Sequence, residues 1–429
     1  MLKAFGNALK IPDLRNKLLF TLMIIGVYRL GSWIPVPGVQ TDLLENLAAG
    51  GSGAGITGIF NVFSGGALTQ MAIFALGIMP YITSSIIMQL LVVVIPKLEQ
   101  LQQEGEQGRR KITQYTRYFT VVLALLQSST LTVLARNGQL FPGVNPIPGA
   151  TTWDIALIVV TFTAGTSLLM WLGELITARG VGNGMSMLIL VSIISQLPSQ
   201  GEVVRQVNGM GILAAVMLLG VVITVAVVFM EQGQRRIPVQ YARRQVGRRS
   251  YGGQSTYIPM KVNQSGVIPV IFASSLLYLP GLIANVTNWG LLRDWTDPTT
   301  GWLSDVRNPG YIALFSAMVI FFAYFYTAIA FNPVEVADNM KKHGGFVPGI
   351  RPGRQTAEYL DKVLTRLTLP GSLYLTLVAI VPFAALALFD VSAFPLGGVS
   401  LLIMVGVALE TMKQIESQLM QRNYEGFLS

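Results

Sequence analysis

The chain has 429 residues, of which 52% are hydrophobic and only 12% are charged, and its mean hydropathy is +0.55. A chain this apolar cannot cover a globular surface with polar side chains, which excludes an ordinary soluble domain. It has no cysteine and a net charge of +9, so disulfides and thiolate metal sites are excluded, and the positions of the basic residues become informative.

The apolar residues come in ten blocks, most of them near the roughly 20 residues that a helix needs to cross a membrane. The blocks fall at 18–34, 71–95, 118–135, 154–172, 184–198, 211–230, 266–284, 310–330, 371–389 and 397–412. The fifth and tenth are short, so length alone leaves them ambiguous between spans and re-entrant segments. The first follows a basic segment without a small-residue cleavage site, so we expect no cleavable signal peptide.

Basic residues are concentrated in alternate loops. They precede the first block and follow the second, fourth, sixth and eighth, whereas the intervening loops carry few. Because basic loops stay in the cytoplasm, this pattern predicts an all-α polytopic membrane protein with ten spans and two cytoplasmic termini. Gly51 and Trp302 are then expected on the opposite face. Five spans precede Gly201 and five follow it in inverted orientation, which predicts two pseudo-symmetric halves at 1–199 and 200–429.

Three connections are too long for simple turns. The cytoplasmic loops at 231–264 and 331–369 are rich in arginine, glycine and proline, which favours hairpin-like protrusions that stand clear of the membrane. On the outer side, a glycine-rich stretch leads into a short apolar piece at 57–69. We predict that this piece re-enters the protein as a plug, and an interfacial helix on the outer leaflet is the alternative that periodicity does not exclude.

Few residues have the character of catalytic groups. His343 is the single histidine, and no cysteine could share a metal with it, so we expect no enzyme and no metal site. Arg29 is the one charge well inside a span, near its outer end, where it either reaches the headgroups or braces a pore mouth. Proton relays place carboxylates near the bilayer midplane, and Glu174 and Glu410 instead lie near cytoplasmic ends.

Six ordered segments distributed over nearly the whole chain carry a specific resemblance. They are RLGSWIPVPGV at 29–39, FSGGALTQMAIFALGIMPYITSSIIMQLL at 63–91, EGEQGRRKITQYTRY at 104–118, GVGNGMSMLI at 180–189, KVNQSGVIPVIFASS at 261–275 and FNPVEVADNMKKHGGFVPGIRPG at 331–353. In these segments the chain resembles the SecY family of protein-translocation channels.

The resemblance implies a helical bundle around an hourglass pore, closed at its waist by apolar side chains and from outside by a plug. It implies a channel that passes unfolded secretory polypeptides across the bacterial inner membrane and releases membrane segments sideways into lipid. A lateral gate would open between the second and seventh spans, at 82–91 and 263–277. No cofactor is implied. Met185 and Val92 depart from the family, which often has isoleucine and a hydroxyl residue there.

The resemblance assigns four groups of residues. The pore ring would be Ile82, Ile86, Met185, Ile189, Ile271 and Ile403. The plug would contain Ile59, Phe60, Asn61, Phe63, Ser64, Gly65, Gly66 and Leu68. The polar residues of the lateral gate would be Gln89, Gln127 and Asn263, for which ordinary hydrogen bonding between helices is the alternative role. The docking surface for cytoplasmic partners would be Arg243, Arg244, Arg248, Arg249, Arg351 and Arg354.

The partners that the resemblance implies are SecE and SecG in the membrane, with the SecA ATPase or the ribosome on the cytoplasmic side. Signal sequences, nascent polypeptides and the lipid bilayer would also contact the chain, and SecA would hydrolyse the ATP. Two other classes stay open on hydropathy alone. A secondary transporter could share the broken helices and repeats but needs a midplane substrate or ion site. An insertase scaffold without a pore predicts that the plug-like piece only rests on the membrane.

Overall fold

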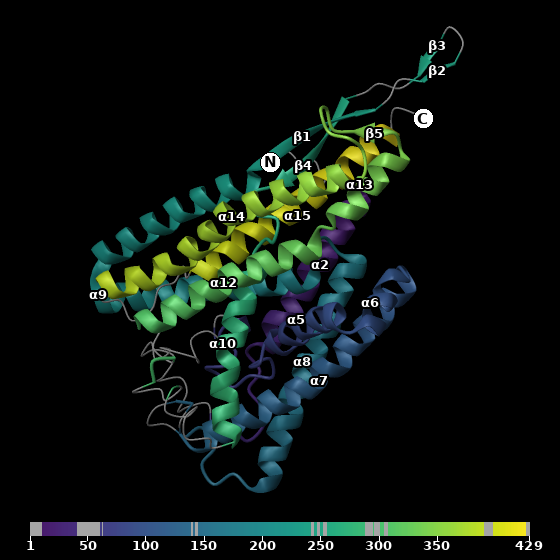
Figure 1. Cartoon of the computed structure of the whole chain (residues 1–429). Coiled ribbons are helices and arrows are strands. Elements are labelled where there is room, and N and C mark those ends of the chain that lie inside the picture. The colour runs from purple at the N-terminus through teal and green to yellow at the C-terminus, as the bar shows by residue number, and fades with distance from the viewer. Residues whose placement is uncertain are drawn as a thin grey trace.

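The computed structural model describes residues 11–40, 61, 63–138, 140–141, 145–241, 244–246, 249–251, 255–287, 295, 301–303, 308–389 and 398–425. Helices dominate this part of the chain (Figure 1). Their bounds are α2 Pro12–Gly31, α5 Met79–Val94, α6 Pro96–Gln103, α7 Glu106–Arg136, α8 Thr152–Arg179, α9 Gly184–Gln232, α10 Ile268–Thr287, α12 Pro309–Ala330, α13 Pro333–Lys342, α14 Arg354–Phe389 and α15 Gly398–Glu425. Every apolar block of the sequence overlaps one of these helices.

Several helices are long and apolar enough to cross a membrane. Within the described residues, α7, α8, α9, α14 and the stretch formed by α12 and α13 satisfy this condition on their own. The pair α5 and α6 satisfies it together but bends by 99° between Val94 and Pro96. The structure is therefore that of a polytopic helical membrane protein, as the hydropathy predicts.

The fifth and sixth blocks share one helix. We expected a loop after residue 198, but α9 continues through Pro198, and the helical conformation breaks only at Gly209, whose φ is +83°. Left-handed φ values suit glycine because it has no Cβ, so the bend falls there. The expected boundary of the halves at 199 and 200 therefore lies in helical chain, and the pseudo-symmetric division stays a prediction.

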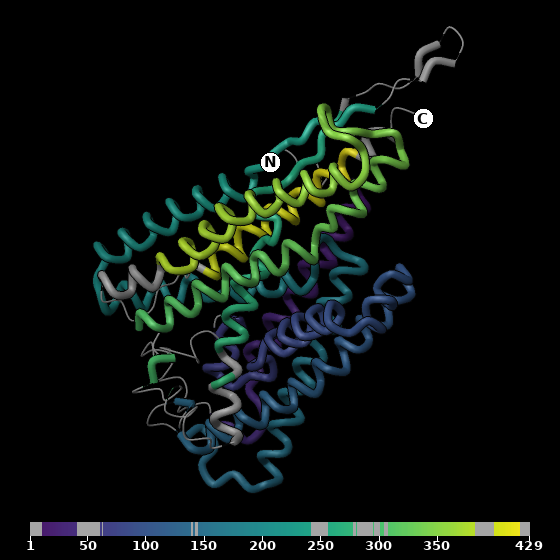
Figure 2. The backbone as a smooth tube through the Cα atoms, in the orientation of Figure 1, coloured from purple at the N-terminus to yellow at the C-terminus, as the bar shows by residue number. Residues whose placement is uncertain are grey.

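The helices form two groups that meet along α9. One group contains α5, α7 and α8, in which α7 packs against both of its neighbours (Figure 1). In the other group, α10 packs against α12, α12 against α14, and α14 against α15. The helix α9 contacts α8 in the first group and α15 in the second, so it connects the two (Figure 2).

The two long loops that are expected on the cytoplasmic side join in one small sheet. Strands β1 (Gln234–Tyr241) and β4 (Ser255–Lys261) form an antiparallel hairpin, and β5 (Gly345–Phe346) from the second loop adds to β1. Strands β2 (Arg244–Val246) and β3 (Arg249–Tyr251) pair separately. The sheet covers a buried cluster of Ile237, Val239, Met260, Met340, Val347, Leu360, Val363 and Leu364. The expected hairpin is confirmed, but the loops form one unit where we expected two protrusions.

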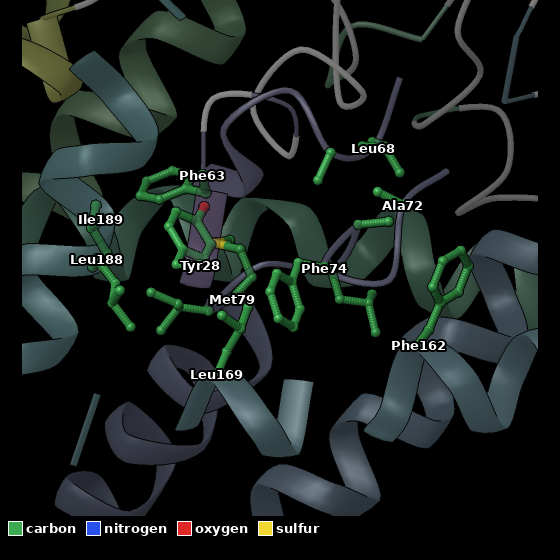
Figure 3. Packing of buried hydrophobic residues seen from close by; sticks show 14 of the residues in the cluster. Tyr28, Phe63, Leu68, Ala72, Phe74, Met79, Phe162, Leu169, Leu188 and Ile189 are labelled. Carbon is green, nitrogen blue, oxygen red and sulfur yellow. The ribbon is translucent and has the colours of Figure 1, made fainter. Parts of the chain in front are cut away.

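The largest buried cluster lies where α2, α5, α8 and α9 surround the segment at 63–78 (Figure 3). This segment runs through turns, although the sequence places a span from residue 71 onward. The helix α5 starts only at Met79, after Gly77 takes a φ of +55°, and Pro80 suits a first helical turn because its missing N–H has no partner there. Hydropathy cannot distinguish buried turns of this kind from a span.

Candidate functional site

The plug-like segment ends in a short helical piece and a glycine turn. Asn61, Phe63 and Ser64 are helical, and Gly65 and Gly66 follow with φ values of +67° and +89°. The turn is closed by a hydrogen bond of 3.1 Å from the Gly66 amide to the Asn61 carbonyl. Ile59 and Phe60, which the sequence assigns to the same segment, lie outside the described residues.

The described part of this segment is buried inside the protein. The side chains of Phe63 and Leu68 are only 3% and 2% exposed. Phe63 lies in the same cluster as Tyr28 of α2 and Ile189 of α9 (Figure 3). An interfacial helix on the outer leaflet would expose its apolar side chains to lipid. The burial therefore favours the re-entrant interpretation over the interfacial one.

The expected ring residues meet this segment in the core. Four of them belong to the same buried cluster as Phe63: Met185, Ile189, Ile271 and Ile403. Ile82 is partly buried and packs against both this cluster and the neighbouring one, whereas Ile86 lies within the neighbouring cluster. Isoleucines in a membrane bundle could equally face lipid, so their burial is a structural result that spacing could not supply. The residues expected in the ring, on α5, α9, α10 and α15, are thus buried or partly buried in apolar clusters, and four of them share a cluster with the segment.

The pair α5 and α7 and the pair α10 and α12 contact each other at few positions. The helix α10 packs along α12 but contacts α5 and α7 at only a few positions, while α5 packs along α7. Little side-chain surface is buried between the two pairs of helices. Separating the pairs therefore needs less free energy than separating the two helices of either pair. The boundary between the two pairs coincides with the lateral gate that the sequence resemblance implies.

The three polar residues expected at the gate do not lie in one group. Gln127 is buried in α7, and its Oε1 atom has no partner among the described residues, whereas Gln89 is exposed on α5. Asn263 precedes α10, and its amide donates to Glu231 at the end of α9 at 2.5 Å. We expected Asn263 at the helix interface, and it instead connects the base of the β1–β4 hairpin to α9. Its residue type did not reveal this partner because 32 positions separate the two.

The expected docking arginines are only partly described. Arg351 and Arg354 are exposed, and Arg354 makes an ion pair of 3.0 Å with Glu358 one turn along α14. Arg244 and Arg249 belong to the paired strands β2 and β3. Arg243 and Arg248 lie outside the described residues. Sequence reasoning missed Arg236, whose guanidinium lies 4.9 Å from the ring centre of Tyr257 across the hairpin.

Comparison with known proteins gives the family. A model of the SecY family matches residues 72–412. The chain belongs to the SecY family. It is 57% identical over 441 residues to the protein translocase subunit SecY of Streptomyces coelicolor and 52% identical over 440 residues to that of Mycobacterium tuberculosis. In both comparisons all of each chain is covered.

Solved structures give the same fold. A structure described as a protein-conducting channel has a TM-score of 0.63 and 18% identity to this SecY-family chain, with 94% of this chain and 91% of that one covered. A channel in a canine ribosome-channel complex from the endoplasmic reticulum has a TM-score of 0.60, 18% identity and the same coverages. At such identity the likeness shows the fold alone, which agrees with the architecture described above.

Sequence reasoning also missed polar residues of this SecY-family chain that contact the plug-like segment. Tyr28 of α2 and Ser192 and Gln196 of α9 are buried beside it. Arg29 was singled out, and its guanidinium donates to the Gly65 carbonyl at 3.2 Å, so bracing is the role that the structure supports. Only their spacing could have indicated them, because Ser192 and Gln196 lie seven residues beyond Met185 and Ile189 and so share a face of α9 with them.

Proposed function

We propose that this chain is the pore-forming subunit of a protein-conducting channel. It passes unfolded secretory polypeptides across the bacterial inner membrane and releases membrane segments sideways into lipid. The single observation that carries the proposal is the meeting of ring and plug. Met185, Ile189, Ile271 and Ile403, from three helices far apart in the sequence, share one buried cluster with Phe63 of the re-entrant segment.

The chemistry of the ring explains both a seal and a lack of sequence preference. Aliphatic side chains offer water and ions no hydrogen bonds, so a narrow ring of them excludes both. The same side chains can move apart around an extended polypeptide without binding any particular residue. A buried plug segment directly against the ring adds a second barrier to ions.

Lateral release follows from the arrangement of the gate helices. The pair α10 and α12 and the pair α5 and α7 are each well packed, and they contact each other sparsely. Separation of the two pairs would connect the ring with lipid. An apolar segment of a passing chain would then leave sideways because its transfer into hydrocarbon is favourable.

The partners in this proposal are SecE and SecG within the membrane and SecA or the ribosome in the cytoplasm. Relatives are named as subunits of a translocase, and one structural neighbour was determined in a ribosome complex. The β1, β4 and β5 sheet and its arginines supply a basic surface that suits phosphate and carboxylate groups. Both termini face the cytoplasm in this proposal, and SecA supplies the ATP hydrolysis.

Two alternatives are less well supported. A coupled transporter needs a cluster of ionisable groups at mid-depth, whereas the residues expected in the ring are buried among apolar side chains. A scaffold without a pore predicts a segment resting on the membrane, whereas Phe63 is buried beside the ring residue Ile189 (Figure 3).

Reconstitution tests the proposal directly. Proteoliposomes that contain this chain with SecE and SecG should take up a precursor protein into a protease-protected state when SecA and ATP are added. Liposomes without this chain are the control. Uptake of small solutes without any precursor protection would select a transporter and contradict the proposal.

A further inference from the structure

The main chain of the plug-like segment is bound from two sides by polar side chains. The Tyr28 hydroxyl lies 3.2 Å from the Ser64 carbonyl, and the Arg29 guanidinium donates to the Gly65 carbonyl at 3.2 Å. From α9, the Gln196 amide donates to the Asn61 carbonyl. The Asn61 and Ser64 carbonyls also accept from the Gly66 and Ala67 amides, so the side chains of Gln196 and Tyr28 are second partners for them, from outside the segment.

A fourth residue completes this arrangement. Ser192 of α9 lies with its Oγ atom 2.5 Å from the Tyr28 oxygen, and both side chains are fully buried. The Ser192 hydroxyl also lies 2.8 Å from the Leu188 carbonyl, so the two hydroxyl hydrogens of Tyr28 and Ser192 are shared among three contacts: the Ser64 carbonyl, the Leu188 carbonyl and each other. The contacts therefore connect α2, α9 and the segment in one network across more than 160 positions of sequence.

Close backbone packing holds the segment against these residues. A Cβ atom on Gly65 would lie 3.1 Å from the Tyr28 hydroxyl and 3.2 Å from the Ser192 Cα atom. A Cβ atom on Gly77 would lie 2.9 Å from the Phe63 carbonyl oxygen. Gly65 also has a φ of +67°, which side chains disfavour. Glycine at these positions allows the polar side chains to reach the main chain.

We infer that Tyr28, Arg29, Ser192 and Gln196 form a latch that holds the plug segment closed by its main-chain carbonyls. This inference rests on the proposed function, in which the segment is a plug. Tyr28, Arg29 and Gln196 each contact a main-chain carbonyl of the segment, and Ser192 contacts Tyr28, so these four contacts do not depend on the side chains of the segment. Tyr28, Ser192 and Gln196 are positioning residues in this scheme and do not touch the polypeptide.

The latch is suited to reversible release. Leaving a buried donor or acceptor unpaired is costly while the core excludes water, but water can take over the same bonds once the pore is wet. Breaking these hydrogen bonds is therefore unfavourable while the channel is closed and dry, and it needs little free energy once water has entered. Ser192 and Gln196 share a face of α9 with the ring residues Met185 and Ile189, so a chain that displaces the ring also displaces the latch.

The test compares the mobility of the segment in variants of the full chain, held in nanodiscs with SecE and SecG. The latch variants are Tyr28→Phe, which keeps the ring stacked on Phe74, and the double variant Tyr28→Phe with Gln196→Leu. The control is Ser128→Ala, which removes a buried hydroxyl contact of 3.2 Å with Thr163 between α7 and α8. Hydrogen exchange at the amides of Gly66 and Ala67 reports on the segment, because both amides bond within it.

The latch predicts exchange at these amides that is roughly tenfold faster in the double variant and unchanged in the control, since each lost bond contributes a modest net stability. It also predicts a larger resting ion conductance in the double variant. Exchange at the wild-type rate in the double variant overturns the latch. An equal rise in Ser128→Ala overturns it too, because general loosening would then explain the result.

Deletion of residues 57–69 tests the proposed function separately. A rise in ion leak supports a plug. If the deletion causes no leak, the segment is not a plug, and the exchange rates still decide whether the four residues hold it.

Discussion

At the scale of single residues, the side chains of the proposed ring depend on how closely neighbouring helices approach them. Met185 stands where the family often has isoleucine, and it packs closely against α8. A Cβ atom on Gly173 of α8 would lie only 2.4 Å from the Met185 sulfur. The end of the methionine side chain therefore lies directly against Gly173, where any larger residue would displace it. Methionine keeps this position apolar, as the proposed ring requires.

Replacement of the ring residues should wet the constriction. We expect the triple variant Ile189→Ser, Ile271→Ser and Ile403→Ser to raise resting ion conductance in planar bilayers, because hydroxyls give water hydrogen-bond partners. Deletion of the plug in this background should raise it further. The matched control is Ile194→Ser on the exposed face of α9, where the side chain is 46% exposed. An ion leak no larger than wild type in the ring-plus-plug variant contradicts the assignment.

The sequence predicts which residues share a face of one helix. It does not predict contacts between residues that are far apart along the chain. Met185 and Ile189 are one turn apart, so their shared face was predictable. The partner of Asn263 is an acid at the end of another helix. The contact between Tyr28 and Ser192 joins residues 164 positions apart. Neither contact leaves a periodic signal, so hydropathy and spacing could not reveal it.

At the scale of elements, glycines set how closely α8 and its neighbours approach. A Cβ atom on Gly184 at the start of α9 would lie 1.8 Å from the Gly173 carbonyl oxygen of α8. A Cβ atom on Gly165 would lie 2.2 Å from the Ile73 carbonyl oxygen of the re-entrant segment. In lipid, helices associate largely through such close packing of small residues. The two close contacts fix the positions of α9 and of the re-entrant segment relative to α8.

A methyl group at the α8–α9 crossing should therefore destabilise the protein. We expect Gly184→Ala to lower the free energy of unfolding by about 1–3 kcal/mol, since backbone must shift to admit it. Thermal unfolding in detergent measures the change. Gly26→Ala in α2 is the matched control, because nothing lies within 4 Å of its Cβ position, and alanine there should raise stability by up to about 1 kcal/mol. Equal melting temperatures for the two variants would contradict the crossing.

Element positions were predictable from hydropathy, and element ends were not. The helix α9 carries a polar stretch after Pro198 that reads as a loop, yet it stays helical to Gly209. The opposite happens at 71–78, where an apolar stretch that reads as a span is folded into buried turns. Both differences arise because tertiary packing, not local composition, decides the conformation of short stretches.

At the scale of the whole molecule, the sheet formed by the two long loops has a buried cluster that is separate from the cluster around the plug-like segment. The sheet and this small core, which lies beneath β1, β4 and β5, form one unit. Asn263 and Glu231 bond at its base, where the hairpin meets α9 and α10. In the proposed function, a partner that binds this unit would be connected through Asn263 to α10, a helix of the proposed gate. The alternation of basic loops predicts that both loops lie on the cytoplasmic side, but only the structure shows that they join in one sheet.

Charge reversal in this unit should affect partners more than folding. We expect the double variant Arg351→Glu and Arg354→Glu to abolish SecA-driven translocation while the protein still inserts into the membrane. Stability should change little, because the pair of Arg354 with Glu358 is highly exposed. Arg110→Glu, at an exposed pair with Glu106 on α7, is the control. Normal translocation by the double variant would refute the docking assignment.

The central claim is that polypeptides cross through the apolar ring. Site-specific photocrosslinking of a stalled translocating chain tests this most directly, with the photoreactive group placed in turn at Ile189, Ile403 and Phe229. The side chain of Phe229 is 78% exposed on α9, so it serves as the lipid-facing control. The account predicts crosslinks to the stalled chain from Ile189 and Ile403 and none from Phe229. Crosslinks from Phe229 alone, with none from the two ring positions, would contradict it.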